Sequence, residues 1–185
     1  MRKIIFASWL VVLCYTAQAQ SDSIVWQTIN ASRGNFTFAL PAQNQNTIDS
    51  ANELVYFAMV DSAIGFSANY VTDFSFDSIP DYDSFTVHLS EGSSPLYAMA
   101  SYMAFETNGT MVQSEVNTVT NHPEIKAVTV GVKYNTIDPS IFTYSFYKMY
   151  YWNNKLLTFS ASAQDDKLND LIAAKTHFFN SVVIQ

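Results

Sequence analysis

Apolar and polar residues alternate along most of this chain. A period of two is typical of strands that bury one face, so the pattern predicts a fold built mainly from β-sheet. The stretch "AVTVGVKY" (127–134) shows the alternation most clearly, because its large apolar side chains fall on one face and its small or polar ones on the other. The first face holds Val128, Val130, Val132 and Tyr134, and the second holds Thr129, Gly131 and Lys133.

Turn residues divide the first half of this pattern into consecutive strands. "IVWQTIN" (24–30) and "FTFALP" (36–41) are joined across Arg33-Gly34. "ELVYFAMVDS" (53–62) and "IGFSANYVT" (64–72) predict a hairpin, and "MVQSEVNTVT" (111–120) predicts a later strand.

The strongest hairpin signal joins "IFTYSFYKMYYW" (141–152) to "KLLTFSASA" (155–163) through Asn153-Asn154. Paired asparagines tolerate the positive φ that a two-residue hairpin turn demands. This turn sets Trp152 opposite Lys155 and produces one coherent apolar face. That face consists of Tyr144, Phe146, Tyr150, Leu157, Phe159 and Ala161.

Two segments change to a helical period. In "SSPLYAMASYMAFETNG" (93–109), Ser94 is the expected cap, Pro95 suits the first turn, and Asn108-Gly109 ends the helix. Its expected apolar stripe is Leu96, Met99, Ala100 and Met103. In "DDKLNDLIAAKTHFFNSVVI" (165–184), we expect Asp165 or Asp166 as the cap. The buried stripe there is Leu168, Leu171, Ile172, Phe178 and Phe179. The predicted fold class is therefore α+β, a mostly antiparallel sheet flanked by helices.

The N-terminus "MRKIIFASWLVVLCYTAQAQ" has the pattern of a secretory signal peptide. Arg2 and Lys3 precede an apolar run that is too short to span a bilayer, and Ala17-Gln18-Ala19 is a small-x-small cleavage site. We expect a bacterial signal over residues 1–19, with export to the periplasm or the extracellular space, and one domain over residues 20–185. The alternative is a lipoprotein signal acylated at Cys14, although Leu13 stands where a small residue should precede that cysteine.

The chain is acidic overall, and its charges are unevenly distributed along the sequence. The net charge is -7, and no lysine or arginine lies between Arg33 and Lys126, a span with eleven acidic residues. A phosphate backbone or an anionic membrane surface would be repelled by this span, so nucleic acid is excluded as a partner. We expect no membrane span and no cofactor. The expected partner is an envelope or extracellular protein, and a small-molecule ligand remains an alternative.

Three stretches resemble the PsbP-like family, the relatives of the extrinsic PsbP subunit of photosystem II. "NFTFALPAQ" (35–43) is similar to the opening motif of that family, and "YYWNNKLLTFSAS" (150–162) followed by "FFNSVVI" (178–184) is similar to its close. "NHPE" (121–124) departs from the Gly-x-Pro-Gly turn of many relatives. The resemblance implies an α-β-α sandwich, shared with a Ran-binding nuclear import factor, and a non-enzymatic accessory or binding role. The resemblance assigns no catalytic residue to any position of this sequence.

The acidic stretch "DFSFDSIPDYDSF" (73–85) is the first candidate site. Its four aspartates are candidates for partner binding: Asp73, Asp77, Asp81 and Asp83. Only Asp81 and Asp83 have the spacing of a calcium loop, and neither the glycine nor the bidentate glutamate of such a loop follows them. The interleaved aromatic residues favour a loop that buries its rings and exposes its carboxylates to water.

His122 and Glu124 are the second candidate pair, because residues two apart on a strand point the same way and could supply two zinc ligands. Zinc needs at least one further protein ligand, and neither His88 nor His177 has ligand-like neighbours in sequence. No serine lies in a Gly-x-Ser-x-Gly elbow, so no catalytic residue is assigned.

Three functions therefore compete at the level of sequence. The first is an exported, non-enzymatic binding domain that uses an acidic face to recognise a basic protein. The second is a small-molecule or lipid carrier with an aromatic-lined pocket between sheet and helices. The third is a hydrolase whose Ser, His and Asp meet only in space.

Overall fold

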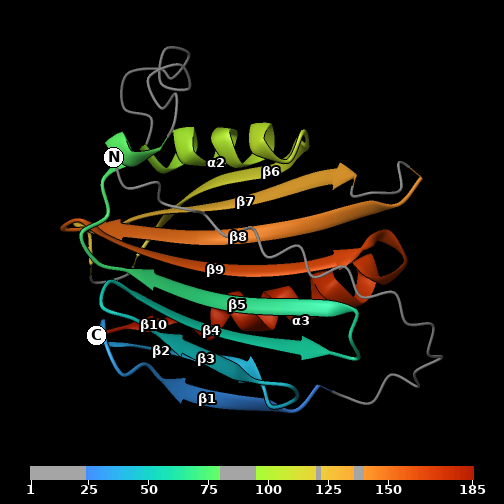
Figure 1. The fold of residues 1–185 in the computed structure, drawn as a ribbon, viewed down its shortest axis with the longest axis horizontal. Helices are drawn as coiled ribbons and strands as arrows, with labels where there is room; N and C mark the ends of the chain where they lie inside the picture. Colours follow the sequence, from blue (N-terminus) through green and yellow to red (C-terminus); the bar gives the residue numbers. More distant parts are fainter. Residues whose placement is uncertain (1–23, 80–94, 120–121, 136–139) are drawn as a thin grey trace.

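The computed structural model describes residues 24–79, 95–119, 122–135 and 140–185. Within them the main element is a seven-stranded, fully antiparallel sheet of order β3-β4-β5-β9-β8-β7-β6 (Figure 1). Its strands are β3 (Asn46–Asp49), β4 (Glu53–Val60), β5 (Ile64–Val71), β6 (Thr110–Thr118), β7 (Lys126–Asn135), β8 (Phe142–Trp152) and β9 (Lys155–Gln164). The alternating pattern thus forms sheet, as expected.

A second, three-stranded sheet of order β1-β2-β10 packs on one face of the main sheet. It consists of β1 (Trp26–Asn30), β2 (Phe36–Pro41) and β10 (Val183–Ile184). β10 comes from the very end of the described chain and pairs Val183 with Thr37. The expected pairing of the first two strands across Arg33-Gly34 is confirmed.

The β8–β9 hairpin has the predicted register. Trp152 pairs with Lys155, and Tyr150 with Leu157. Asn153 and Asn154 have φ of 45° and 58°, the left-handed conformation that the two-residue turn requires. The predicted β4–β5 hairpin is confirmed as well. For the β8–β9 hairpin, the local turn chemistry of Asn153-Asn154 predicted the register.

The two helices lie on opposite faces of the main sheet (Figure 1). α2 (Pro95–Glu106) buries Leu96, Met99 and Ala100 against the large-residue face of β7. It ends where the Gly109 amide donates to the Ala104 carbonyl, with Asn108 at φ 49°. Ser94 lies outside the described residues.

α3 (Leu168–Asn180) lies on the other face, beside the small sheet and in contact with both sheets. Phe178 is fully buried there, with its ring 5.3 Å from that of Phe66 and 5.5 Å from that of Phe159. Phe38 of β2 joins the same cluster, 5.3 Å from Phe159 in edge geometry. This aromatic cluster joins α3, the small sheet and the main sheet, because edge-to-face rings add their own attraction to the burial of apolar area.

Two expectations for the last helix are wrong. Asp165 and Asp166 do not cap it but form a short 3₁₀ turn, η2 (Asp165–Lys167), that precedes α3. Ile172 is 44% exposed, because the buried stripe runs through Leu171, Ala174 and Phe178 and turns Ile172 outward. None of the helices in the described part of the chain is long and apolar enough to cross a bilayer.

Phe178→Ala tests the role of the aromatic cluster. We expect the change to lower the free energy of unfolding by about 3–5 kcal/mol, because it removes a fully buried ring from a site bounded by two sheets. Chemical denaturation measures the loss. Ile172→Ala is the matched control on the same helix and should cost less than about 1 kcal/mol. Equal losses for the two variants would contradict this packing.

Two tyrosines of β8 predict a loss of stability at alkaline pH. Burial raises the pKa of Tyr147 to about 12, and burial also raises the pKa of Tyr150. Between pH about 10, where an unfolded tyrosine ionises, and the higher folded value, the unfolded chain binds fewer protons, so stability falls as pH rises. Tyr147→Phe should make this fall shallower in denaturation curves recorded from pH 8 to about 12. A slope identical to that of the unmodified protein would contradict the prediction.

Candidate functional site

One end of the main sheet gathers acidic residues from separate parts of the chain. This end contains the end of β3, the start of β4, the end of β5 and the β8–β9 turn. The segment after β5 is held between two turns, because the Thr72 amide donates to the Asn52 carbonyl (3.0 Å) and the Phe74 amide donates to the Asn154 carbonyl (2.7 Å). We call this region the acidic end and define it by Asp49, Glu53, Asp73 and Asp77.

The segment from Asp73 to Asp77 presents its carboxylates outward and its rings inward. Asp73 and Asp77 are exposed, whereas Phe74 is buried and Phe76 packs on Tyr151 with ring centroids 4.7 Å apart. The short turn η1 (Phe76–Ser78) begins with Ser75 as its cap, whose hydroxyl accepts from the Asp77 amide (3.3 Å). The aromatic side chains therefore anchor the segment while the carboxylates face water. Asp81 and Asp83 lie outside the described residues.

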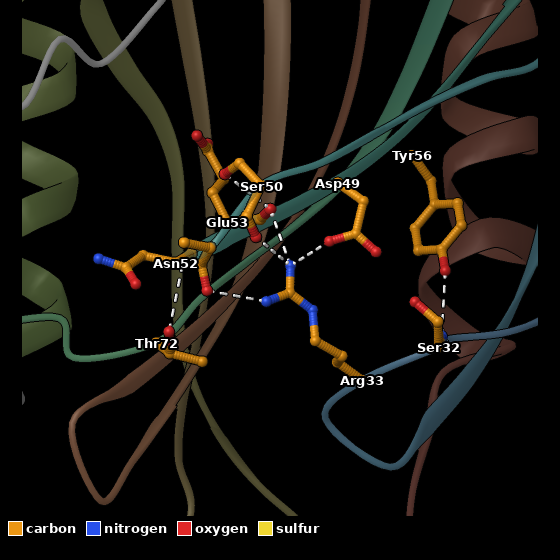
Figure 2. Close-up of polar contacts among 9 residues, drawn as sticks. Ser32, Arg33, Asp49, Ser50, Asn52, Glu53, Tyr56 and Thr72 are labelled. Atoms are coloured by element: carbon orange, nitrogen blue, oxygen red, sulfur yellow. Dashed lines mark hydrogen bonds and ion pairs between the residues drawn. The ribbon is translucent and has the colours of Figure 1, made fainter.

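Arg33 binds the neighbouring β3–β4 turn through hydrogen bonds (Figure 2). Its Nη2 donates to Asp49 Oδ1 (2.6 Å), to the Ser50 carbonyl (2.7 Å) and to the Glu53 carbonyl (3.0 Å), and its Nη1 donates to the Ala51 carbonyl (3.0 Å). One guanidinium thus satisfies the carbonyls of a whole turn, a use for which its planar fork of donors is suited.

The loop that carries Arg33 depends on Gly34. Its φ is 89°, and a Cβ at this position would lie 2.9 Å from the Phe36 ring and 3.0 Å from the Tyr70 ring. Only glycine combines that backbone conformation with that close approach. The main chain therefore turns sharply enough to direct Arg33 across the sheet edge onto the β3–β4 turn.

The electrostatic consequence is that the charge of Arg33 is already paired within the fold. Arg33 binds Asp49 and three carbonyls, and Glu53 Oε1 accepts from Asn69 Nδ2 (2.9 Å). Asp73 and Asp77 take part in no ion pair among the described residues. The acidic end therefore offers outward carboxylates on a segment that is fixed by backbone bonds and buried rings.

His122 and Glu124 contact one another at the β6–β7 turn, with 3.2 Å between His122 Nδ1 and Glu124 Oε1. The pKa of Glu124 is lowered, first by a hydrogen bond from the backbone and then by the His122 side chain. No group of three possible metal ligands converges among the residues that the structure describes. His122 and Glu124 thus form an exposed pair that closes a turn.

A polar groove of about 550 Å³ lies between β6, β7 and β8 on one side and β10 on the other. Lys148 lies in it, half-buried, and its Nζ donates to the Phe179 carbonyl at the end of α3 (3.1 Å). Burial lowers the pKa of Lys148, and Glu115 across the groove partly offsets this effect. Nearby, Thr129 Oγ1 donates to Asn117 Oδ1 (2.6 Å). Sequence reasoning missed this groove, because β8 alone gives no sign that α3 ends above Lys148.

The histidine of α3 is also engaged in packing. His177 packs on Trp26 with ring centroids 4.5 Å apart and the two rings tilted by 40°. Ser181, one turn later, accepts from the Ala39 amide (2.8 Å) and donates to the Phe178 carbonyl (2.7 Å). Thr176, the hydroxyl next to His177 in sequence, donates to the Ile172 carbonyl (2.9 Å). Both hydroxyls are thus committed to the backbone, and in the described part of the chain neither forms a nucleophile–base pair with His177.

No protein-family model matches the chain, and no curated protein matches it. Among solved structures it is similar to cyanobacterial PsbP (CyanoP) from Synechocystis sp. PCC 6803, with a TM-score of 0.58 and 10% identity over 92% of this chain and 98% of that one. It is also similar to LpqN, involved in cell envelope biogenesis of Mycobacterium tuberculosis, with a TM-score of 0.46 and 10% identity over 88% and 91%. The first similarity covers nearly both chains, and the fold is therefore PsbP-like, as the sequence motifs implied.

Arg33→Ala tests the fastening of the acidic end. We expect a loss of about 2 kcal/mol in the free energy of unfolding, because four carbonyl and carboxylate acceptors lose their donor. Hydrogen–deuterium exchange should quicken first in residues 46–53. Lys126→Ala, which removes an exposed cation at the same end of the sheet, is the control and should leave this exchange unchanged. Equal protection in both variants would show that the turn holds without Arg33.

Proposed function

We propose that this protein is an exported, non-enzymatic accessory domain that binds a basic partner protein through its acidic end. The observation that carries the proposal is the fixed, outward placement of the Asp73 and Asp77 carboxylates on buried aromatic anchors. Asp81 and Asp83 continue the same acidic stretch and are included in the proposed surface. The PsbP-like fold agrees with this role, since the resemblance to that family implies accessory binding.

Electrostatics supports a protein partner for this surface. A rigid cluster of like charges raises the association rate of a partner of opposite charge and discriminates against acidic competitors. A flexible acidic segment would lose ordering entropy on binding, whereas the backbone bonds of Thr72 and Phe74 already hold the part that carries Asp73. The proposal includes removal of residues 1–19 on export, which takes away Arg2 and Lys3 and makes the remaining chain more acidic.

The two other functions have less support. A carrier would need a hollow between sheet and helices, and in the described core that space is filled by Phe38, Phe159 and Phe178. The polar groove beside Lys148 favours a small polar ligand over a lipid and is the basis for this second candidate. A hydrolase would need a base aimed at a nucleophile, and the described histidines contact Glu124 and Trp26 instead.

A pull-down from the native cell envelope tests the proposal. The protein should retain a basic partner in about 0.05 M salt and release it in about 1 M salt, because screening shortens the reach of exposed charges. The variant that carries Asp→Asn at 73, 77, 81 and 83 should fail to retain the partner even in about 0.05 M salt. The matched control carries Asp→Asn at 61, 165, 166 and 170, which removes the same charge from exposed sites at the other end of the sheet. Retention by the first variant, or equal loss by both, would refute this binding surface.

A further inference from the structure

The longest free strand edge in the described structure belongs to β6. It is the outermost strand of the main sheet beside β7 and is nine residues long, whereas β3 at the opposite edge has four. Natural edge strands avoid pairing by being short, by carrying charged residues or proline, or by a bulge. β6 has one charged residue, Glu115, and a bulge near its start, but it contains no lysine or proline, and its Val112 and Val116 side chains are 48% and 66% exposed. An exposed strand edge of this kind favours pairing with a strand of another chain.

We propose that β6 pairs with β6 of a second copy of this chain, antiparallel, about a two-fold axis through Ser114. This interface is separate from the acidic end and goes beyond the proposed binding function. It joins two seven-stranded sheets into one, since β-strand addition needs only free main-chain groups and matching side chains.

The side chains of β6 select the register. Paired residues must lie on the same face of a continuous sheet, so only every second register is allowed. An axis through Glu115 would place two like charges opposite each other, which is destabilising. An axis through Ser114 instead sets Val112 of one copy opposite Val116 of its partner. Both exposed valines are then covered, and Glu115 faces the neutral Gln113.

Charge at the edge supports the same register. Lys175 of α3 reaches over β6, where its Nζ lies 3.2 Å from Gln113 Oε1 and 3.9 Å from the centroid of the Phe146 ring. Its pKa is lowered by burial, and it has no carboxylate within 4.0 Å among the described residues. With Glu115 of the partner copy opposite Gln113, a carboxylate comes beside this half-buried cation in each of the two symmetric positions.

The geometry of the edge sets the extent of the pairing. β6 contains a bulge at Val112, since Met111 pairs with Val132 and Gln113 with the next residue, Gly131. Bulges interrupt regular pairing, so the new ladder runs from Gln113 to Glu115 in each copy, and Val112 and Val116 of the two copies flank it. Ile172, one turn before Lys175 on the same side of α3, is 44% exposed. Such a short ladder predicts a dimer that dissociates on dilution.

Disulfide trapping tests the register. In a Cys14→Ser background, which leaves no other thiol, Ser114→Cys should give a disulfide-linked dimer under mild oxidation, because the two-fold axis brings this residue next to itself. Asn117→Cys on the same strand is the matched control and should stay monomeric, since its partner position is Met111. Equal trapping at both positions, or trapping at Val116→Cys in place of Ser114→Cys, would overturn the register.

Sedimentation velocity over a range of protein concentrations tests the association itself. Glu115→Lys should weaken the dimer about tenfold by placing a cation beside Lys175, and Lys175→Glu added to it should restore the association. Asp166→Lys, the same charge change on the exposed turn η2, is the control and should leave the association unchanged. A chain that sediments as a monomer at every concentration would refute the proposal, and so would a failure of the double variant to recover.

Discussion

The structure depends on the burial of aromatic rings between the main sheet, the small sheet and α3. Phe178 makes no contact with solvent, and its neighbours Phe66 and Phe159 come from β5 and β9. Phe38 of β2 brings the small sheet into the same cluster. Because these rings come from the beginning, middle and end of the chain, one packed layer fixes the positions of α3 and of both sheets.

The surface features follow from that layer. β2 is held against the main sheet by Phe36 and Phe38, so the loop between β1 and β2 reaches the β3–β4 turn and Arg33 can bind it. That binding pairs the charge of Arg33 with Asp49, whereas the nearby Asp73 and Asp77 face water. The groove has the same origin, because α3 ends over β8 where the Phe179 carbonyl meets Lys148. The candidate binding surfaces are thus consequences of how the core is packed.

Local signals predicted the elements whose causes are local. The Asn153-Asn154 turn determined the β8–β9 register, and Asn108-Gly109 marked the end of α2, because positive φ is a property of the turn residues themselves. The same reasoning failed for Ile172, which matches the apolar spacing of α3 but lies outside the stripe that the sheets select. It also gave no sign of β10, since a two-residue strand is defined by its partner β2 and not by its own sequence.

The sequence by itself determined that the chain forms antiparallel strands with two helices, and it located the acidic stretch, because periodicity and charge are properties of neighbouring residues. Only the tertiary structure decided which carboxylates stay unpaired, where Lys148 lies and which strand edge remains open. Those outcomes depend on contacts between residues far apart in the chain, such as Arg33 with Asp49 or Lys175 with Gln113. No local pattern encodes such contacts, since they exist only after the aromatic layer has closed.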